Sequence, residues 1–338
     1  MSSIHKSFLE PFFIEMNKIF DKEWCVLHSY ETLPNYSESD VDMAFSGADI
    51  NALEELILKT AKNQGWTVYQ KLWYDSEQCF YYVLKDNKDD IELAIDFLID
   101  RKGVGKYGFE TTKLTSECNR WNEIVPIPNS SVAFSYKLVK RVVKHRDLSL
   151  DNEYLLNHFN QADMSEIYSI LDNQFGKKGL DILVPYLNKK DFSISKSDRN
   201  NLMSMKKKSR VSRFYWETQR IFNRISAPCG MVISIPSTME ENDKNQFIKE
   251  LEARVGLLFR FVRYEEKAAW FLKFKSLIGS TLIIESSTEL SIQNDWLGSK
   301  KSMVEVEDKE NQTVENLIEI YYAEILKTFK ERKRFKEL

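Results

Sequence analysis

The chain has 338 residues, 29% of them charged, and a formal net charge of −3. This near balance gives no reason to expect a nucleic-acid partner, and the length predicts about two or three domains of ~100–200 residues. None of the four cysteines forms a CxxC pair, which argues against a zinc site and a disulfide framework. The sequence shows neither a basic-then-apolar leader nor a run of about 18 apolar residues, so we expect a cytoplasmic protein without a membrane span.

The first third of the sequence alternates between helix and strand patterns. Apolar residues spaced three and four apart predict a helix over residues 4–20, and a short strand follows over 24–27. Gly47-Ala-Asp49 indicates the start of a second helix, which Gly65 closes. Further strands are expected over residues 66–73, 79–84 and 91–98. This order predicts an α/β or α+β fold built on a mixed sheet.

Three aspartates stand out from this pattern. Asp40 and Asp42 lie two residues apart on an expected strand, so their side chains point to the same face. Two carboxylates so near to each other repel unless a divalent cation lies between them. Hard oxygen ligands of this kind suit Mg²⁺ or Mn²⁺. Asp96 lies in an apolar run, where a buried carboxylate needs a partner, and is the expected third ligand. The alternatives are a solvated acidic turn at Asp40 and Asp42, and a strand-ending turn at Asp96.

Two neighbouring acids compete with Asp96 for these roles. Asp100 is followed by Arg101, Lys102 and Gly103 and fits a turn better than Asp96 does. Glu92 shares the expected strand face of Asp96 and remains a spare candidate ligand.

The order of helix, strand, serine-containing loop, DxD strand, helix and later aspartate resembles the polymerase-β-type nucleotidyltransferase fold over roughly residues 1–125. In that family pattern Ser29 belongs to the phosphate loop, Asp40 and Asp42 form the DxD, and Asp96 is the later aspartate. His28 stands where the family usually has glycine, a residue without a side chain that lets a phosphate approach the backbone closely.

The resemblance implies transfer of a nucleotide from a nucleoside triphosphate to an acceptor such as a sugar, a polyol or a protein hydroxyl. The three aspartates would hold Mg²⁺ or Mn²⁺, and Asp96 would also position or deprotonate the attacking group. His28 and Ser29 would belong to the nucleotide-binding loop, with Ser29 bonded to a β- or γ-phosphate. Lys85 would add positive charge, although an exposed strand-end lysine often serves only solubility.

A proline-marked connector at Val125-Pro-Ile-Pro-Asn-Ser ends the first domain, predicted as residues 1–126. The following helix, over 131–145, carries Lys137, Lys140 and Lys144 on one side. These lysines either meet substrate phosphates or form a solvated basic face, and the second interpretation is favoured.

Short helices with breaks at Gly176 and Gly179 continue to residue 189, so residues 127–224 are expected to form a helical domain. The basic run Lys206–Arg213, followed by aromatic residues, has the composition of a site for single-stranded nucleic acid or anionic lipid. An exposed helix start or linker is the favoured interpretation of this run.

Residues 225–338 open with a strand, loop and helix pattern that resembles the start of a P-loop kinase domain. The GxxxxGK(S/T) motif is absent, because Ser237, Thr238 and Lys244 are out of register. Strands expected at 257–262 and 280–285 and a helix at 314–329 are compatible with a degenerate P-loop α/β domain. The whole chain thus resembles bacterial proteins, found with surface-polysaccharide genes, that join a nucleotidyltransferase-like half to a thymidylate kinase-like half. The resemblance implies that the last domain lacks kinase activity and serves packing, dimerisation or substrate binding.

Three functions follow from these patterns. The first is a metal-dependent nucleotidyltransferase, the second an inactive scaffold in which both halves have decayed, and the third a nucleic-acid-modifying transferase. The intact set of three aspartates favours the first. On this interpretation, replacing Asp40 and Asp42 by asparagine leaves the melting temperature of the metal-free protein unchanged or higher.

Overall fold

The computed structural model of the chain contains two compact units. It describes residues 3–75, 79–89, 91–103, 105, 107–144, 151–206, 214–215, 217–219, 221–222, 231–235, 239–255, 260–263, 281–286, 303–305 and 313–331. The first unit comprises Met1–Trp66, Tyr74–Tyr81 and Ile95–Thr218, and the second comprises Thr67–Trp73, Tyr82–Ala94 and Gln219–Leu338. The predicted division into residues 1–126, 127–224 and 225–338 stays a prediction.

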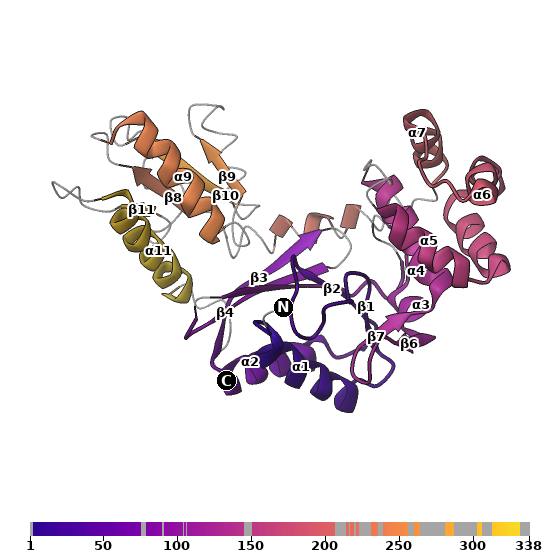
Figure 1. Cartoon of the computed structure of the whole chain (residues 1–338), viewed down its shortest axis with the longest axis horizontal. Coiled ribbons are helices and arrows are strands. Elements are labelled where there is room, and N and C mark those ends of the chain that lie inside the picture. The colour runs from indigo at the N-terminus through magenta and orange to yellow at the C-terminus, as the bar shows by residue number, and fades with distance from the viewer. Residues whose placement is uncertain are drawn as a thin grey trace. The chain divides into compact units, whose positions relative to one another are not determined.

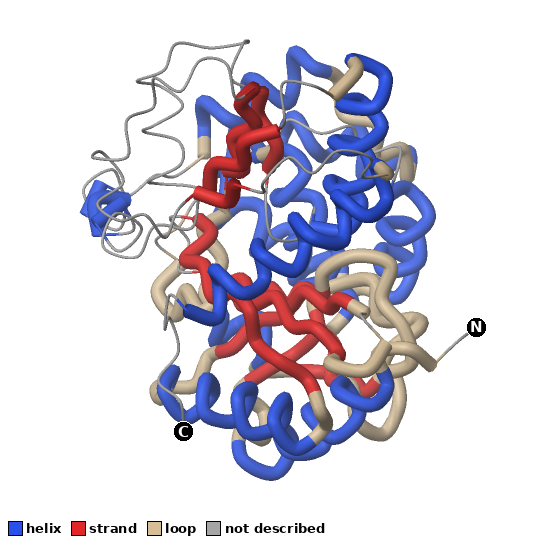
Figure 2. Tube along the Cα trace, turned by 90° about the vertical axis from the view of Figure 1, so that its left-hand side faces the viewer, coloured by secondary structure: helices blue, strands red, loops and turns tan. Residues whose placement is uncertain are grey.

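The N-terminal elements form a mixed sheet with helices, as predicted. In chain order they are α1 (Lys6–Ile19), β1 (Trp24–Val26), β2 (Val41–Phe45), α2 (Ile50–Asn63), β3 (Trp66–Asp75), β4 (Cys79–Asp86) and β5 (Glu92–Leu98). The strand order is β1-β2-β5-β4-β3, with β1 antiparallel to β2 and β2 parallel to β5. Helices α1 and α2 lie on one face of this sheet (Figures 1 and 2).

Aromatic side chains join α1 to the strands. Phe8, Phe12 and Phe13 are fully buried on one side of the helix, as the spacing of apolar residues predicts. The ring of Phe13 stacks on Trp24 of β1 with centroids 5.3 Å apart, and Phe12 meets Phe97 of β5 edge to face at 6.3 Å. These contacts fix the middle of the sheet, where β2 and β5 run side by side.

Local signals define the ends of α2. The side chain of Asp49 caps the helix by accepting a hydrogen bond from the backbone N–H of Ala52 at 3.0 Å. Gly65 follows the helix with a φ of 74°, a left-handed conformation that glycine adopts without strain.

The rest of the first unit is mainly helical. Its elements are α3 (Thr111–Thr115), β6 (Cys118–Arg120), β7 (Pro126–Pro128), α4 (Ser130–Val143), α5 (Asn152–Gln161), α6 (Met164–Lys189) and α7 (Lys196–Met205). The segment predicted to be only a connector forms β7, which pairs antiparallel with β6. Asn129 directly after it caps α4 by accepting from the N–H of Val132, so this stretch sets where α4 begins.

Only one of the two predicted glycine breaks is observed in α6. Gly176 has φ 74° and ψ 171°, and the helix is kinked there. Gly179 lies inside the helix, where a Cβ would come within 2.4 Å of the Phe175 Cβ. Gly179 therefore serves close packing and does not break the helix.

The start of the basic run is buried, which contradicts an exposed helix start at that residue. The Lys206 ammonium donates to the carbonyl of Tyr107 at 2.7 Å and to Oε1 of Gln174 at 2.6 Å. Residues 207–213 lie outside the described residues.

The second unit contains an all-parallel sheet in the order β11-β8-β10-β9. Its elements are β8 (Met231–Ile235), α9 (Glu241–Val255), β9 (Arg260–Arg263), β10 (Thr281–Ser286), β11 (Met303–Glu305) and α11 (Val314–Glu331). Helices α9 and α11 pack through Phe247 and Tyr321, with ring centroids 5.1 Å apart. The predicted α/β character is confirmed. Ser237 and Thr238 lie outside the described residues, and Lys244 lies near the start of α9.

Candidate metal-binding site

Three carboxylates converge where β2 and β5 run in parallel. Asp40 immediately precedes β2, Asp42 belongs to β2, and Asp96 belongs to β5. The strand register sets Asp42 opposite Asp96, and one carboxylate oxygen from each of the three residues lies within 4.8 Å of the other two. The predicted grouping is therefore present in the fold.

The environment of these oxygens suits a hard divalent cation. Oδ1 of Asp96 is buried and has no hydrogen-bond partner in the described part of the chain. A buried carboxylate oxygen without a partner is costly, and coordination to a cation would satisfy it. Because all three donors are carboxylates, Mg²⁺ and Mn²⁺ fit the set.

The three carboxyl groups differ in their electrostatic surroundings. Burial, followed by the charge of Asp42, raises the pKa of Asp96 well above its usual value. The same two causes raise the pKa of Asp40. Burial alone would also raise the pKa of Asp42, but His28 and Lys140 together hold it well below the usual value. The negative charge of Asp42 therefore contributes to the raised pKa of the other two carboxyl groups.

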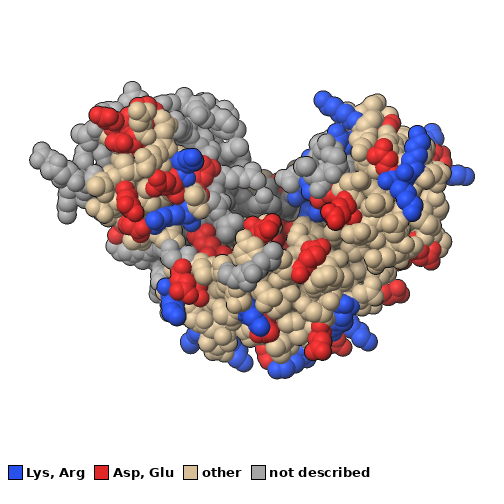
Figure 3. Space-filling model, viewed as in Figure 1, with Lys and Arg blue, Asp and Glu red and all other residues tan. Residues whose placement is uncertain are grey.

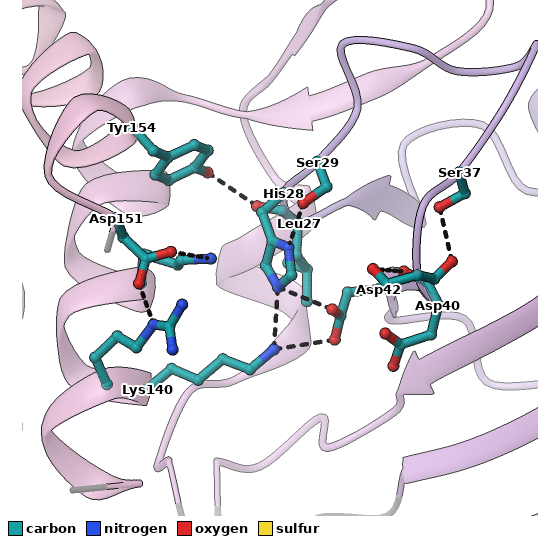
Figure 4. A network of polar contacts seen from close by, with 12 residues as sticks. Leu27, His28, Ser29, Ser37, Asp40, Asp42, Lys140, Asp151 and Tyr154 are labelled. Atoms are coloured by element: carbon teal, nitrogen blue, oxygen red, sulfur yellow. Dashed lines mark hydrogen bonds and ion pairs between the residues drawn. The ribbon is translucent and has the colours of Figure 1, made fainter. Parts of the chain in front are cut away.

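Both oxygens of Asp42 have a nitrogen partner (Figure 4). Oδ2 lies 2.8 Å from Nε2 of His28, and Oδ1 accepts from the Lys140 ammonium at 3.0 Å. Nζ of Lys140 is also 3.1 Å from Nε2 of His28. Burial opposes the charge of Lys140, yet the Asp42 carboxylate raises the pKa of this lysine above its ordinary value.

The interpretation of the α4 lysines as a solvated basic face is wrong for two of them. Lys137 and Lys140 are only 8% and 9% exposed. Lys137 pairs with Asp151 at 3.2 Å, and Arg141 pairs with the same carboxylate. Because Asp151 immediately precedes α5, these ion pairs tie α4 to the start of the next helix and hold the side of α4 that carries Lys140.

The loop after β1 supplies the second partner of Asp42. Nδ1 of His28 lies 3.2 Å from the Ser29 hydroxyl, and burial foremost lowers the pKa of the His28 ring. A ring that carries its proton on Nε2 donates to Asp42 and accepts from Ser29. Ser29 itself is exposed and has a φ of 56°. One residue before His28, the carbonyl of Leu27 accepts a hydrogen bond from the Tyr154 hydroxyl at 3.0 Å. The phosphate-binding role of Ser29 and His28 stays a prediction.

A pocket adjoins Asp42 and Asp96 and encloses about 340 Å³ of space, part of it open to solvent. Its polar lining includes Lys140 and Lys144. Two tyrosines of the lining lie below these lysines: Nζ of Lys140 is 5.6 Å from the ring centre of Tyr136, and Nζ of Lys144 is 5.8 Å from that of Tyr107. Apolar lining comes from Leu27, Met43, Cys79 and Leu98. The pocket thus combines positive charge with aromatic surface beside the carboxylates.

Lys85 is not an exposed strand-end residue. It belongs to the second unit, is 4% exposed, and its ammonium lies 3.9 Å from the ring centre of Tyr322. Its nucleotide-binding role stays a prediction, and the observed contact is a packing contact with α11.

The turn assigned to Asp100 is confirmed, because its Oδ2 accepts from the backbone N–H of Gly105 at 2.7 Å. Glu92, the spare ligand, is not part of the group of converging carboxylates.

The contact of Lys140 with the aspartates was not the interpretation favoured from the sequence, which was a solvated basic face. Its signal was indirect: three lysines at positions 137, 140 and 144 follow a helical spacing, and three converging carboxylates need a balancing positive charge. Nothing in the local pattern of α4 identifies which lysine meets them.

Acidic and basic side chains are interspersed among the described residues on the face drawn in Figure 3. Within the described part of the chain, no helix is long and apolar enough to cross a membrane.

Comparison with protein-family models, with curated proteins and with solved structures gives no match. The geometry of the carboxylates and of their contacts is therefore what supports a function for this chain.

Proposed function

We propose that the chain is a Mg²⁺- or Mn²⁺-dependent nucleotidyltransferase that moves a nucleotide from a nucleoside triphosphate to a hydroxyl or phosphate acceptor. The observation that carries this proposal is the convergence of Asp40, Asp42 and Asp96 within 4.8 Å on two parallel strands. A DxD and a later aspartate in that arrangement resemble the polymerase-β-type nucleotidyltransferases.

The three carboxylates would hold the metal. When bound, it would supply Lewis-acid polarisation of the phosphate oxygens and lower the pKa of the acceptor hydroxyl. Asp96 would also take the acceptor's proton, which is the role that the resemblance gives to the later aspartate. In the balanced reaction the acceptor oxygen bonds to the α-phosphorus, the bond from that phosphorus to the bridging oxygen breaks, pyrophosphate leaves, and the proton passes to Asp96.

The pocket supports a substrate with both negative charge and a planar or apolar part. Lys140 and Lys144, which lie over the rings of Tyr136 and Tyr107, would meet phosphate oxygens.

From the resemblance to surface-polysaccharide proteins with a thymidylate kinase-like half, we propose that this activity serves polysaccharide biosynthesis, with a sugar, polyol or protein acceptor. The all-parallel sheet of the second unit supports the α/β part of that resemblance. On this proposal the last domain lacks kinase activity because its sequence has no intact P-loop motif. A cytoplasmic location and a homodimer belong to the same proposal.

One observation favours a second candidate, an inactive scaffold. Both oxygens of Asp42 already have protein partners, His28 and Lys140. A carboxylate neutralised by its own chain needs no metal ion to be stable in the fold. The nucleic-acid-modifying alternative depended on the basic run, of which residues 207–213 lie outside the described residues.

The test is thermal unfolding with each ribo- and deoxyribonucleoside triphosphate, with and without Mg²⁺ or Mn²⁺. We expect one nucleotide to raise the melting temperature only with the metal, because a ligand at about 100 times its Kd adds ~2.7 kcal/mol. Asp40→Asn/Asp42→Asn should lose this shift. Glu38→Gln, which removes an exposed acid two residues before Asp40, should keep it.

A metal-dependent shift that survives in Asp40→Asn/Asp42→Asn would place the nucleotide elsewhere and reject the proposed site. The absence of a shift with every nucleotide would favour the scaffold.

A further inference from the structure

The positively charged group that contacts Asp42 in this fold is a side chain of the protein itself, Lys140. The Lys140 ammonium lies 3.0 Å from Oδ1, and His28 Nε2 lies 2.8 Å from Oδ2. The side chains of Lys140 and Asp42 are only 11% and 12% exposed, so solvent screens their attraction weakly.

This contact conflicts with the use of Asp42 as a metal ligand. A divalent ion bound to Oδ1 would lie within a few ångströms of the ammonium, where two positive charges repel strongly at low dielectric. The contact with the ammonium and the binding of a divalent ion at Oδ1 therefore oppose each other. The Oδ1 atom of Asp96, which is buried and has no hydrogen-bond partner in the described part of the chain, gives the divalent ion an independent reason to bind here.

We propose that Lys140 is an internal cation that competes with a divalent metal ion for Asp42, so that the metal binds only when the ammonium leaves this carboxylate. The inference rests on the proposed function, because it concerns the control of the same site.

The pocket provides a place for the displaced ammonium. Lys140 lines it together with Lys144, and the ammonium already lies 5.6 Å from the ring centre of Tyr136. Away from Asp42, the ammonium is an unpaired cation in a pocket beside the carboxylates, where an anionic ligand would stabilise it. Metal and anionic substrate would therefore favour each other's binding, each compensating a charge that the other exposes.

The test is direct titration with Mn²⁺ alone, followed by the electron paramagnetic resonance signal of free Mn²⁺. Lys140→Met keeps much of the side-chain volume and removes the charge. We expect it to bind Mn²⁺ at least about tenfold more tightly than the wild type, because the competing cation is gone. Adding Asp42→Asn to Lys140→Met should abolish the gain.

Lys144→Met is the matched control. It removes the same charge from the next turn along and from the lining of the same pocket, whereas the 3.0 Å contact with Asp42 belongs to Lys140. We expect its affinity for Mn²⁺ to change much less than that of Lys140→Met. Lys140→Gln, a neutral polar replacement, should reproduce the gain if Lys140→Met does not fold.

The outcomes separate this inference from the proposed function. The competition would be overturned if the wild type, Lys140→Met and Lys140→Gln bound Mn²⁺ with equal affinity. If Asp42→Asn then abolished this binding, the proposed metal site would still stand. An equal gain in Lys144→Met would also overturn the competition, because general electrostatics would then suffice. No Mn²⁺ binding to any form would overturn both.

Discussion

Asp42 and Asp96 lie opposite each other on paired strands, yet their carboxyl groups are stabilised in opposite charge states. His28 and Lys140 hold the pKa of Asp42 well below its usual value against the effect of burial. Burial and the negative charge of Asp42 raise the pKa of Asp96. Without a metal, therefore, the surroundings favour the charged form of Asp42 and disfavour the charged form of Asp96.

The first consequence is that Asp42 stabilises the metal-free fold. Asp42→Asn leaves the buried Lys140 ammonium without its counter-charge, and breaking such a pair costs roughly 3–5 kcal/mol. We expect a loss of this size in the free energy of unfolding, measured by urea denaturation at pH 7 with a chelator present. Glu38→Gln, whose carboxylate is exposed, should change it by less than about 0.5 kcal/mol.

This expectation reverses the one drawn from the sequence alone, which had the metal-free protein unchanged or more stable after loss of Asp40 and Asp42. The sequence shows that the two acids are close to each other but not that Lys140 compensates one of them. An Asp42→Asn protein as stable as the wild type would mean that the ion pair contributes nothing net to folding.

Asp96 should behave in the opposite way. Its folded-state pKa lies above the unfolded value, so the folded protein binds its proton more tightly, and stability falls as pH rises from about 4 through the folded pKa. Asp96→Asn removes that loss. We expect the metal-free variant to be more stable than the wild type at pH 7, with the difference vanishing below about pH 4.

The measurement is the pH dependence of urea unfolding for both proteins in chelator. A lower stability of Asp96→Asn at pH 7 would show that the Asp96 carboxylate is satisfied in the folded protein, and would remove the reason to place a cation beside its unpartnered oxygen.

Among the elements, those defined by local patterns were predicted well. The helices α1 and α2 and the strands β3, β4 and β5 follow from apolar spacing, a capping aspartate and a closing glycine, all of which are local signals. Strand β7 was missed because its two prolines lack backbone N–H groups and are typical of a connector. Among the described strands it pairs with the three-residue strand β6 alone, an edge position that tolerates proline.

Helix α4 shows where local patterns cease to inform. Its extent was predicted, but the helix is buried on nearly all sides, including the side that carries Lys137 and Lys140. Whether a lysine face is solvated depends on what packs against it, and here the partners are distant in sequence: Asp42 precedes Lys140 by 98 residues. The carboxylate cluster was predictable because strand periodicity places Asp40 and Asp42 together. The cation beside it was not.

In the whole chain, the two compact units share strands. Each of β3, β4 and β5 has residues in both units: β4, for example, changes from the first to the second between Tyr81 and Tyr82. Within the second unit, Lys85 of β4 contacts Tyr322 of α11.

Shared strands predict cooperative unfolding of the whole chain. The residues of the five-stranded sheet are divided between the two units, so the loss of its backbone hydrogen bonds would affect both units. We therefore expect differential scanning calorimetry of the full chain to show a single transition with equal calorimetric and van't Hoff enthalpies. Asp42→Asn, far from α11 in sequence, should shift that entire transition to lower temperature. Two resolved transitions would contradict this expectation if only one of them responded to Asp42→Asn. The effect of losing one ion pair would then be confined to the domain that contains it, as expected for independent domains such as residues 1–126, 127–224 and 225–338.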